Sequence, residues 1–316
     1  MNWYGYMGKI LRINLTKEKV TVEPLKEDWV KLFLGATGFG ARVLWDELEK
    51  GIDPLSPENK LILSTGPFVG TLIPGSGSLF YEFKSPLTGL WGESRVGGKI
   101  GPKLKYSGFD MVIVEGRSEK PTYLSIIDEE AEIRKAHDIW GKTVHETTDI
   151  LLEEVGDYDA SVACIGPAGE NLVKFASVMS DYDRAAARCG IGAVMGSKNL
   201  KAIVINGQKD IRVAENEKFY EAVEEASEAL KKYPFLPLFK KYGTHCLTDL
   251  NNQAGSLPTK NFKTCYWEGA NNLSQNVFAG KYVIKRRSCF GCVVGCGRYS
   301  YVPNGSYYTP PHEGPE

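Results

Sequence analysis

Residues 110–128 read Asp-Met-Val-Ile-Val-Glu-Gly-Arg-Ser-Glu-Lys-Pro-Thr-Tyr-Leu-Ser-Ile-Ile-Asp, and this stretch decides the fold class. Its two apolar runs, 111–114 and 122–127, are rich in β-branched residues and are each followed by turn residues, which is typical of β-strands. Only a short polar segment separates the runs, whereas a doubly wound sheet places a helix after each strand. The stretch therefore predicts an α+β fold rather than a doubly wound sheet.

Strand-like segments extend from this stretch toward both ends of the chain. Further strands are predicted for a hairpin within 8–24 and for 61–64, 79–83, 161–165 and 201–206. Helices are predicted for 38–50 with Gly51 as C-cap, for the segment from a Thr143 and Glu146 capping box to Gly156, and for 214–233, which Pro234 ends. The glycine-rich segments 66–77, 85–99 and 181–198 are expected to be mainly loops.

The composition changes after residue 206, which predicts two domains. We expect a sheet-rich N-terminal domain over 1–210, followed by the start of a mainly helical domain over 211–316. With 316 residues the chain is long enough for this arrangement and for a large buried core.

Composition and charge exclude several classes of protein. Hydrophobic residues make up 42% and charged residues 24%, as in an average globular protein, and the apolar runs are too short to span a bilayer. The start of the chain does not resemble a secretory signal, so we expect a cytoplasmic protein with reduced cysteines. The formal charge of -1 and the dispersed basic residues give no support to a nucleic-acid partner.

Three of the seven cysteines, Cys289, Cys292 and Cys296, lie in a C-x2-C-x3-C spacing. Thiolates suit iron-sulfur clusters and zinc, and the neighbouring glycines allow a short loop to wrap round a metal centre. Basic residues at 285–287 and at Arg298 favour ionised sulfurs. Because zinc sites usually pair two C-x2-C units or use histidines, the spacing favours an iron-sulfur cluster, with zinc as the alternative and a fourth ligand still to be found.

The segment 181–198 combines two arginines, Arg184 and Arg188, with glycines at 190, 192 and 196. Guanidinium groups and glycine-rich backbone suit phosphate. The spacing fits neither a Walker loop nor a dinucleotide fingerprint. Phosphate binding and tight packing of a helix on a sheet are equally supported by this segment in isolation.

Taken together, these stretches resemble the aldehyde ferredoxin oxidoreductase family of tungsten enzymes. The motifs occur in the family's order along nearly the whole chain. They are Gly8-Lys-Ile-Leu-Arg-Ile-Asn-Leu-Thr16, Asp53-Pro-Leu-Ser-Pro-Glu-Asn-Lys-Leu61, Thr65-Gly-Pro67, Lys84-Ser-Pro-Leu-Thr-Gly89, Gly166-Pro-Ala-Gly-Glu-Asn-Leu-Val-Lys174, Arg184-Ala-Ala186, Gly192-Ala-Val-Met-Gly-Ser-Lys-Asn-Leu-Lys-Ala202 and the cysteine triplet.

The resemblance implies that the first domain carries a tungsten bis-molybdopterin and that Cys289, Cys292 and Cys296 ligate a [4Fe-4S] cluster. It also implies a magnesium ion that bridges the pterin phosphates and is held by the backbone carbonyls of Arg95 and Ala185. The positions that match the family's pterin contacts are Arg95, Gly97, Arg184, Ala185, Ala187 and Arg188. The implied reaction is oxidation of an aldehyde to a carboxylic acid, with ferredoxin as electron acceptor, in a homo-oligomeric enzyme.

The chain departs from the family pattern at three of these positions. Ser78 stands where the best-known members have an arginine, Arg95 where they have asparagine, and Ala187 where they have glycine. We hypothesise that an arginine has moved from one side of the phosphates to the other. Family members are also about twice as long, so the fourth cluster cysteine and the acid-base residues are expected beyond Glu316, and no catalytic residue is assigned.

Three further readings of the chain follow from these departures. The chain is a non-catalytic truncated piece or one half of a split enzyme that needs a C-terminal partner chain; or it belongs to a member with another redox couple, such as aromatic-ring reduction or a molybdenum variant; or it is a zinc-stabilised binding module. Cys164, Cys189, Cys246 and Cys265 are candidates for the fourth ligand, although the family supports none of them.

Overall fold

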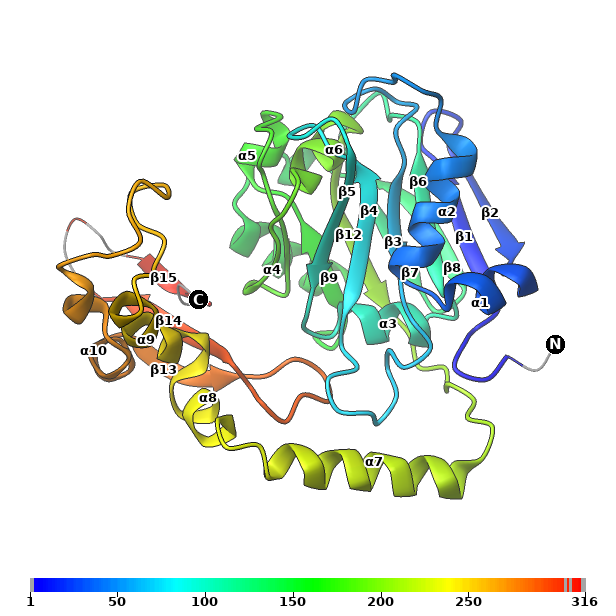
Figure 1. Cartoon of the computed structure of the whole chain (residues 1–316). Helices are drawn as coiled ribbons and strands as arrows, with labels where there is room; N and C mark the ends of the chain where they lie inside the picture. Colours follow the sequence, from blue (N-terminus) through cyan, green and yellow to red (C-terminus); the bar gives the residue numbers. More distant parts are fainter. Residues whose placement is uncertain (1–2, 304–305, 307–308, 314–316) are drawn as a thin grey trace. The chain divides into compact units, whose positions relative to one another are not determined.

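A computed structural model describes residues 3–303, 306 and 309–313 (Figure 1). The chain divides into two compact units, Met1–Phe219 and Tyr220–Glu316, and the division falls within helix α7 (Asn216–Lys231). The boundary expected from the sequence, near residue 210, lies in the segment before this helix. Among the described residues, none of the helices combines the length and the apolar character that crossing a bilayer requires.

The first unit contains two six-stranded sheets. The strands of the first sheet all lie within residues 9–115, and those of the second all lie within residues 122–206. The first runs in the order β2-β1-β6-β3-β4-β5, with β1 Lys9–Asn14, β2 Lys19–Pro24, β3 Leu61–Ser64, β4 Leu79–Lys84, β5 Trp91–Val96 and β6 Met111–Glu115. The second runs β11-β10-β9-β12-β7-β8, with β7 Thr122–Ile127, β8 Glu130–Lys135, β9 Ser161–Cys164, β10 Val178–Ser180, β11 Arg184–Ala186 and β12 Leu200–Asn206.

The two strands predicted from 110–128 lie in different sheets. β6 pairs with β1 in parallel and with β3 antiparallel in the first sheet, while β7 pairs with β12 in parallel and β8 antiparallel in the second. Nearly every residue of both strands is buried. Strands covered on both faces carry apolar residues at every position, so their sequences contain no alternation that would reveal their neighbours.

The core has three apolar layers. The largest lies between the sheets and includes Leu63, Tyr81 and Val112 of the first sheet with Leu124 and Ile203 of the second. A second layer lies under the helices α1 (Glu27–Phe33) and α2 (Thr37–Glu47), which cover the outer face of the first sheet (Figure 1). A third joins α4 (Val144–Val155) to the second sheet. The remaining helical segments of this unit are α3 Ile100–Tyr106, η1 His137–Ile139, α5 Pro167–Glu170 and α6 Ile191–Ser197.

Local signals set some helix boundaries and not others. The predicted capping box is confirmed, since Thr143 Oγ1 accepts from the Glu146 amide and Glu146 returns the bond, and Gly156 ends α4 in the left-handed region. The prediction for 38–50 was too long, because α2 ends at Glu47 and its C-cap, Leu48, is extended. Helix α1 was not predicted; at seven residues it is too short for a clear apolar period.

Two of the expected loops contain strands. β5 lies within 85–99 and β11 within 181–198. Both segments are rich in Gly, Ser, Ala and charged residues, which have low strand propensity. β5 pairs along its whole length with β4, and β11 pairs with β10, so tertiary pairing overrides local preference. These two strands carry Arg95, Arg184 and Ala185, and the other three predicted pterin contacts follow directly after them.

The second unit combines short helices with a three-stranded antiparallel sheet, β13-β14-β15. This sheet was not predicted, because the segment after the helix was expected to be loop-rich. The elements of the second unit that follow α7 are α8 Leu236–Tyr242, η2 Gly243–Cys246, α9 Leu247–Gln253, η3 Ala270–Leu273, α10 Gln275–Lys281, β13 Val283–Arg287, β14 Gly297–Val302 and β15 Thr309–Glu313.

Candidate functional site

The predicted pterin-contacting residues come from two segments, 95–97 and 184–188, which meet where β5 of the first sheet approaches β11 of the second. The Arg188 amide donates to Ser94 Oγ of β5 at 3.1 Å. A Cβ placed on Gly98, just after β5, would lie 3.1 Å from Cγ of Arg184 on β11. Gly98 has φ +92°, a conformation that favours glycine, so the close approach and the backbone both require this residue. We call this place the arginine seam.

Arg95 is exposed on the outer face of β5. Its Nε donates to Ser78 Oγ at 2.9 Å, and its guanidinium carbon lies 5.8 Å from the centroid of the Phe80 ring. The Arg95 side chain therefore reaches along β4 to the position of Ser78. The guanidinium group stands beside the residue at which the family resemblance expected an arginine.

Arg184 on β11 and Arg188, two residues after this strand ends, differ in exposure. The Arg184 side chain is only 9% exposed, and its Nε lies 3.8 Å from Asp183 Oδ1. Arg188 is exposed, as are Ala185 and Ala187, while Gly97 beside the seam is half-buried. Arg188 and the exposed backbone at 185 and 187 are therefore accessible to a ligand, whereas Arg184 is largely enclosed by protein.

Tyr182 was not identified from the sequence, and it holds the hairpin that carries Arg184. Asp181 and Tyr182 form the tip with φ +52° and +73°, which is unfavourable for residues other than glycine. The tip is tied on both sides: Asp181 accepts from Ser161 Oγ at 2.9 Å, and the Tyr182 hydroxyl donates to Asp149 on α4 at 2.7 Å. No local signal marks Tyr182, because its role depends on the distant helix α4.

The chemistry of the seam suits an anionic, phosphate-bearing ligand. Two exposed guanidinium groups bring positive charge and several N–H donors, and the exposed alanine backbone allows close approach. The residues therefore fit the phosphate groups of a pterin cofactor by charge and by type of donor.

The cysteine triplet lies in the loop that joins β13 to β14. Gly291 and Gly295 adopt left-handed conformations, with φ +62° and +56°, and the Cys292 amide donates to the Cys289 carbonyl at 3.1 Å. Cys289, Cys292 and Cys296 are half-buried, and none of them is in a disulfide. Their type and exposure fit metal ligation, but within the described ranges no three His, Cys, Asp or Glu side chains are arranged to hold a metal ion.

Arg298, which the sequence suggested as a charge beside the thiols, instead anchors the end of this loop. It is only 2% exposed. Its Nη1 donates to the Gly295 and Gly297 carbonyls at 2.9 and 2.7 Å, and its Nη2 donates to two carbonyls of α8, those of Phe239 and Lys240, both at 2.9 Å. A single guanidinium thus joins the cysteine loop to a helical residue that lies 58 positions earlier in the chain.

The four other cysteines have different environments. Cys164 is buried in the core of the first unit, and burial raises the pKa of its thiol to about 11. Cys189 is half-buried in that unit, Cys246 is buried in the second unit and Cys265 is exposed. A thiol with a raised pKa is a poor metal ligand, which argues against Cys164 as the fourth one.

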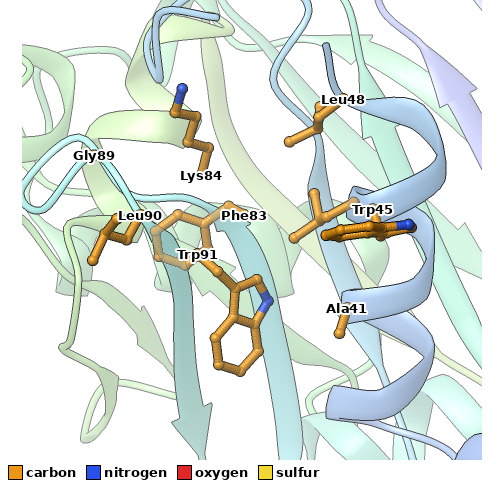
Figure 2. A pocket seen from close by; sticks show the side chains of 9 residues that line it. Ala41, Trp45, Leu48, Phe83, Lys84, Gly89, Leu90 and Trp91 are labelled. Atoms are coloured by element: carbon orange, nitrogen blue, oxygen red, sulfur yellow. The ribbon is translucent and has the colours of Figure 1, made fainter. Parts of the chain in front are cut away.

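A separate apolar groove lies between α2 and the loop that joins β4 to β5, with a cavity volume of about 320 Å³. Figure 2 shows Trp45 of α2 and its C-cap Leu48 on one side and Phe83, Leu90 and Trp91 on the other. Trp45 is 83% exposed and Leu90 70% exposed. The groove was not predicted from the sequence, since its walls come from segments about forty residues apart.

Comparison with known proteins finds matches along nearly the whole chain. Residues 10–207 match the family described as "Aldehyde ferredoxin oxidoreductase, N-terminal domain", and residues 221–316 match "Aldehyde ferredoxin oxidoreductase, domains 2 & 3". The chain is 48% identical over 305 residues to the tungsten-containing aldehyde ferredoxin oxidoreductase of Pyrococcus abyssi, covering 95% of this chain and 50% of that protein.

Two more distant similarities cover the same length. An aliphatic sulfonate oxidoreductase, WOR-like subunit, from Pyrococcus furiosus is 33% identical, covering 96% of this chain and 51% of that protein. Among solved structures, the active site complex BamBC of benzoyl coenzyme A reductase superposes with a TM-score of 0.84 at 32% identity, covering 96% of this chain and 48% of that one. The chain thus spans about half the length of the relatives it matches.

Proposed function

The chain belongs to the aldehyde ferredoxin oxidoreductase family, and we propose from this membership that it forms the cofactor-binding part of a tungsten oxidoreductase that converts an aldehyde to a carboxylic acid. The observation that carries the proposal is the arginine seam, where the segments that carry β5 and β11 meet and where both Arg95 and Arg188 are exposed. The seam would hold the phosphate groups of a bis-pterin cofactor through Arg95, Arg188 and the backbone at Gly97, Ala185 and Ala187.

The contact between Arg95 and Ser78 supports the hypothesis that an arginine has moved across the seam. Arg95 Nε reaches Ser78 Oγ at 2.9 Å, so a guanidinium occupies the neighbourhood of residue 78 although residue 78 is serine. Arg184 is 9% exposed and packs its stem against Gly98, so it contributes charge and shape to the floor of the seam. We therefore assign the main phosphate contacts to Arg95 and Arg188.

When bound, the tungsten pterin supplies the two-electron redox centre at which an aldehyde is oxidised. The residues of this chain bind and orient the cofactor. The buried double sheet fixes β5 and β11 relative to each other, so that the charges which face the phosphates are in place before binding. We further propose that the carbonyls of Arg95 and Ala185 hold a magnesium ion between the phosphates, because hard cations prefer oxygen ligands.

We propose that Cys289, Cys292 and Cys296 ligate a [4Fe-4S] cluster that passes electrons to ferredoxin. The C-x2-C-x3-C spacing, the half-buried cysteines and the two left-handed glycines of the loop support this assignment. Arg286 is exposed on β13 beside the loop and would favour the docking of an acidic ferredoxin. A C-terminal half chain would bring the fourth ligand and the acid-base residues, since the curated relatives are about twice as long. The family resemblance is also our basis for proposing a homo-oligomer in the cytoplasm.

A second candidate function is reduction of an aromatic ring on a coenzyme A thioester. The superposition with the benzoyl coenzyme A reductase complex favours it, at 32% identity. The 48% identity to an aldehyde oxidoreductase over the same length favours the aldehyde reaction. A molybdenum variant and a non-catalytic fragment would each differ from the proposed enzyme in the metal that the purified chain retains.

The testing experiment is metal and pterin analysis of the chain, purified without oxygen after production alone and together with the C-terminal half of the Pyrococcus abyssi relative. We expect tungsten, pterin and iron in the joint preparation. Molybdenum in place of tungsten would indicate the molybdenum variant, and zinc or no metal in both preparations would contradict the proposal.

Single variants of the joint preparation test the seam. Removing a guanidinium that bonds a phosphate should weaken cofactor retention about tenfold. We expect Arg95→Ala and Arg188→Ala to lose pterin, while Arg42→Ala, an exposed arginine on α2 that pairs with Asp46, retains it. Equal pterin content in Arg95→Ala and Arg42→Ala would contradict the assignment of Arg95.

A further inference from the structure

Two carboxyl groups, those of Glu82 and Glu93, lie opposite each other beneath α2. Glu82 on β4 and Glu93 on β5 are direct partners in the antiparallel ladder, so their side chains project from the same, outer face of the first sheet. Like charges at directly opposite positions repel each other. Glu82 is fully buried, with an exposed fraction of 0%.

Each carboxyl group accepts one hydroxyl hydrogen bond. Ser64 Oγ of β3 donates to Glu82 Oε1 at 2.7 Å, and Thr37 Oγ1, in the first turn of α2, donates to Glu93 Oε2 at 2.8 Å. The other Glu82 oxygen, Oε2, is buried without a hydrogen-bond partner in the described part of the chain. An ionised carboxylate in that position would leave a desolvated negative charge uncompensated.

The Glu82 carboxyl group packs directly against the backbone of α2. A Cβ placed on Gly40 would lie 2.5 Å from Glu82 Oε2, so the helix rests on this oxygen and only glycine fits there. Above the pair, α2 faces the sheet with Gly40 and the apolar Phe39 and Val43. This packing leaves no room for water to solvate a charge on Oε2.

The nearby cations on the same face are engaged elsewhere. Lys84 follows two residues after Glu82, and its Nζ donates to the Ile52 carbonyl at 2.6 Å. Arg95 follows two residues after Glu93, and its Nε donates to Ser78. On the exposed side of α2, Arg42 pairs with Asp46. The charged group that faces Glu82 is therefore Glu93, and burial followed by the Glu93 charge raises the pKa of Glu82 to about 8.

We propose that Glu82 and Glu93 hold one proton between them at neutral pH, carried by Glu82, and that this proton keeps α2 seated on the first sheet. Loss of the proton to solvent base would place two negative charges under the helix and weaken the packing of α2 on the first sheet. Because α2 forms one wall of the apolar groove in Figure 2, the same proton would set the width of that groove. The inference is independent of any cofactor.

The sign of the pH effect follows from linkage. Between the ordinary pKa of a glutamate, about 4.3, and the raised value of about 8, the folded state binds one more proton at Glu82 than the unfolded state does. Stability therefore falls as pH rises through this window and levels off above it. One proton changes the unfolding equilibrium constant about tenfold per pH unit in the middle of the window.

The experiment compares the full chain with Glu82→Gln, which keeps the acceptor for Ser64 but cannot ionise. Urea unfolding is measured at several pH values for both proteins. As pH rises, the unfolding equilibrium constant of the wild type should increase by about tenfold more per pH unit than that of Glu82→Gln. Glu27→Gln, an exposed residue of α1, is the matched control and should follow the wild type. Equal slopes for wild type and Glu82→Gln would overturn the proposal.

Two measurements on the wild type keep the test decisive if the variant does not fold. Infrared spectroscopy at neutral pH should show the carbonyl band of a neutral carboxylic acid, and this band should disappear with a midpoint near pH 8. Hydrogen exchange, corrected for intrinsic rates, should show α2 losing protection over the same range while α4, with its own capping box, does not. Absence of the band, or its survival in a folded Glu82→Gln, would also overturn the proposal.

Discussion

The arginine seam and the cysteine loop are held in place by different kinds of structure. The seam rests on two sheets with a continuous apolar core between them, and its strands are edge strands of that sandwich. The cysteine loop rests on a small sheet and on a guanidinium that bonds backbone carbonyls on both sides. Beneath the seam rigidity comes from buried apolar area, and at the cysteine loop it comes from a few directed hydrogen bonds.

This difference predicts how each region responds to mutation. Apolar burial is spread over many side chains, so a single change near the seam removes a small part of it. The hydrogen bonds of Arg298 converge on one residue, so one substitution removes all of them. The proposed cluster would add metal-ligand bonds to a loop that is otherwise weakly held, and metal binding is commonly coupled to folding in this way.

The largest effect is expected from the buried ion pair of Lys105 and Asp110 in the first unit. Both side chains are 0% exposed, and Asp110 also accepts from the Gly8 amide at 2.7 Å. Because Lys105→Met leaves this carboxylate buried without its cation, it should cost about 3–5 kcal/mol in the free energy of unfolding. Urea unfolding measures the loss of stability, and hydrogen exchange shows which backbone amides lose protection. An equal loss of protection in the second unit would contradict the distinction between the two regions.

Arg298→Met tests the second unit in the same way. It leaves several buried carbonyls without their donor, so it should lower the stability of this unit by about 3 kcal/mol. Arg286→Met on the exposed face of β13 is the control and should change it by less than about 0.5 kcal/mol. If the two variants unfold at the same urea concentration, the loop is not held by Arg298.

The alkylation rates of a buried and an exposed cysteine provide a third test. Since burial raises the pKa of Cys164 to about 11, little thiolate forms at pH 8. Cys265 is exposed. Native alkylation of Cys164 should therefore be at least about a hundredfold slower than that of Cys265, which corresponds to about 2.7 kcal/mol. Mass spectrometry of the alkylated peptides checks this, and comparable rates would mean that the core of the first unit opens readily.

The smallest effect is expected at the hairpin tip beside the seam. Tyr182→Phe removes the hydroxyl bond to Asp149 and keeps the ring, so it should cost about 1 kcal/mol. Tyr158→Phe, at a residue 74% exposed, is the control. A much larger loss for Tyr182→Phe, measured by urea unfolding, would show that the seam depends on directed bonds as much as the cysteine loop does.

The two sites also differed in how much of them was predictable. The three cysteines lie close together in the sequence, so their spacing alone indicated a metal site. The role of Arg298 was not predicted, because the carbonyls that it binds include one in the distant helix α8. The seam was outlined through the family resemblance, which named Arg95, Arg184 and Arg188. The strands that carry Arg95 and Arg184 were taken for loops, since glycine, serine and alanine in β5 and β11 give no strand signal by themselves.

The sequence by itself determined the strands β1–β4, β6, β7, β9 and β12, the place where the capping box starts α4, and the family that the chain resembles. Tertiary structure alone decided that β6 and β7, neighbours in the chain, lie in different sheets, and that Glu82 faces Glu93 beneath α2. The physical reason is that strand propensity and capping act within a few residues. The neighbours of a fully buried strand are selected by packing across the whole core, which no local pattern records.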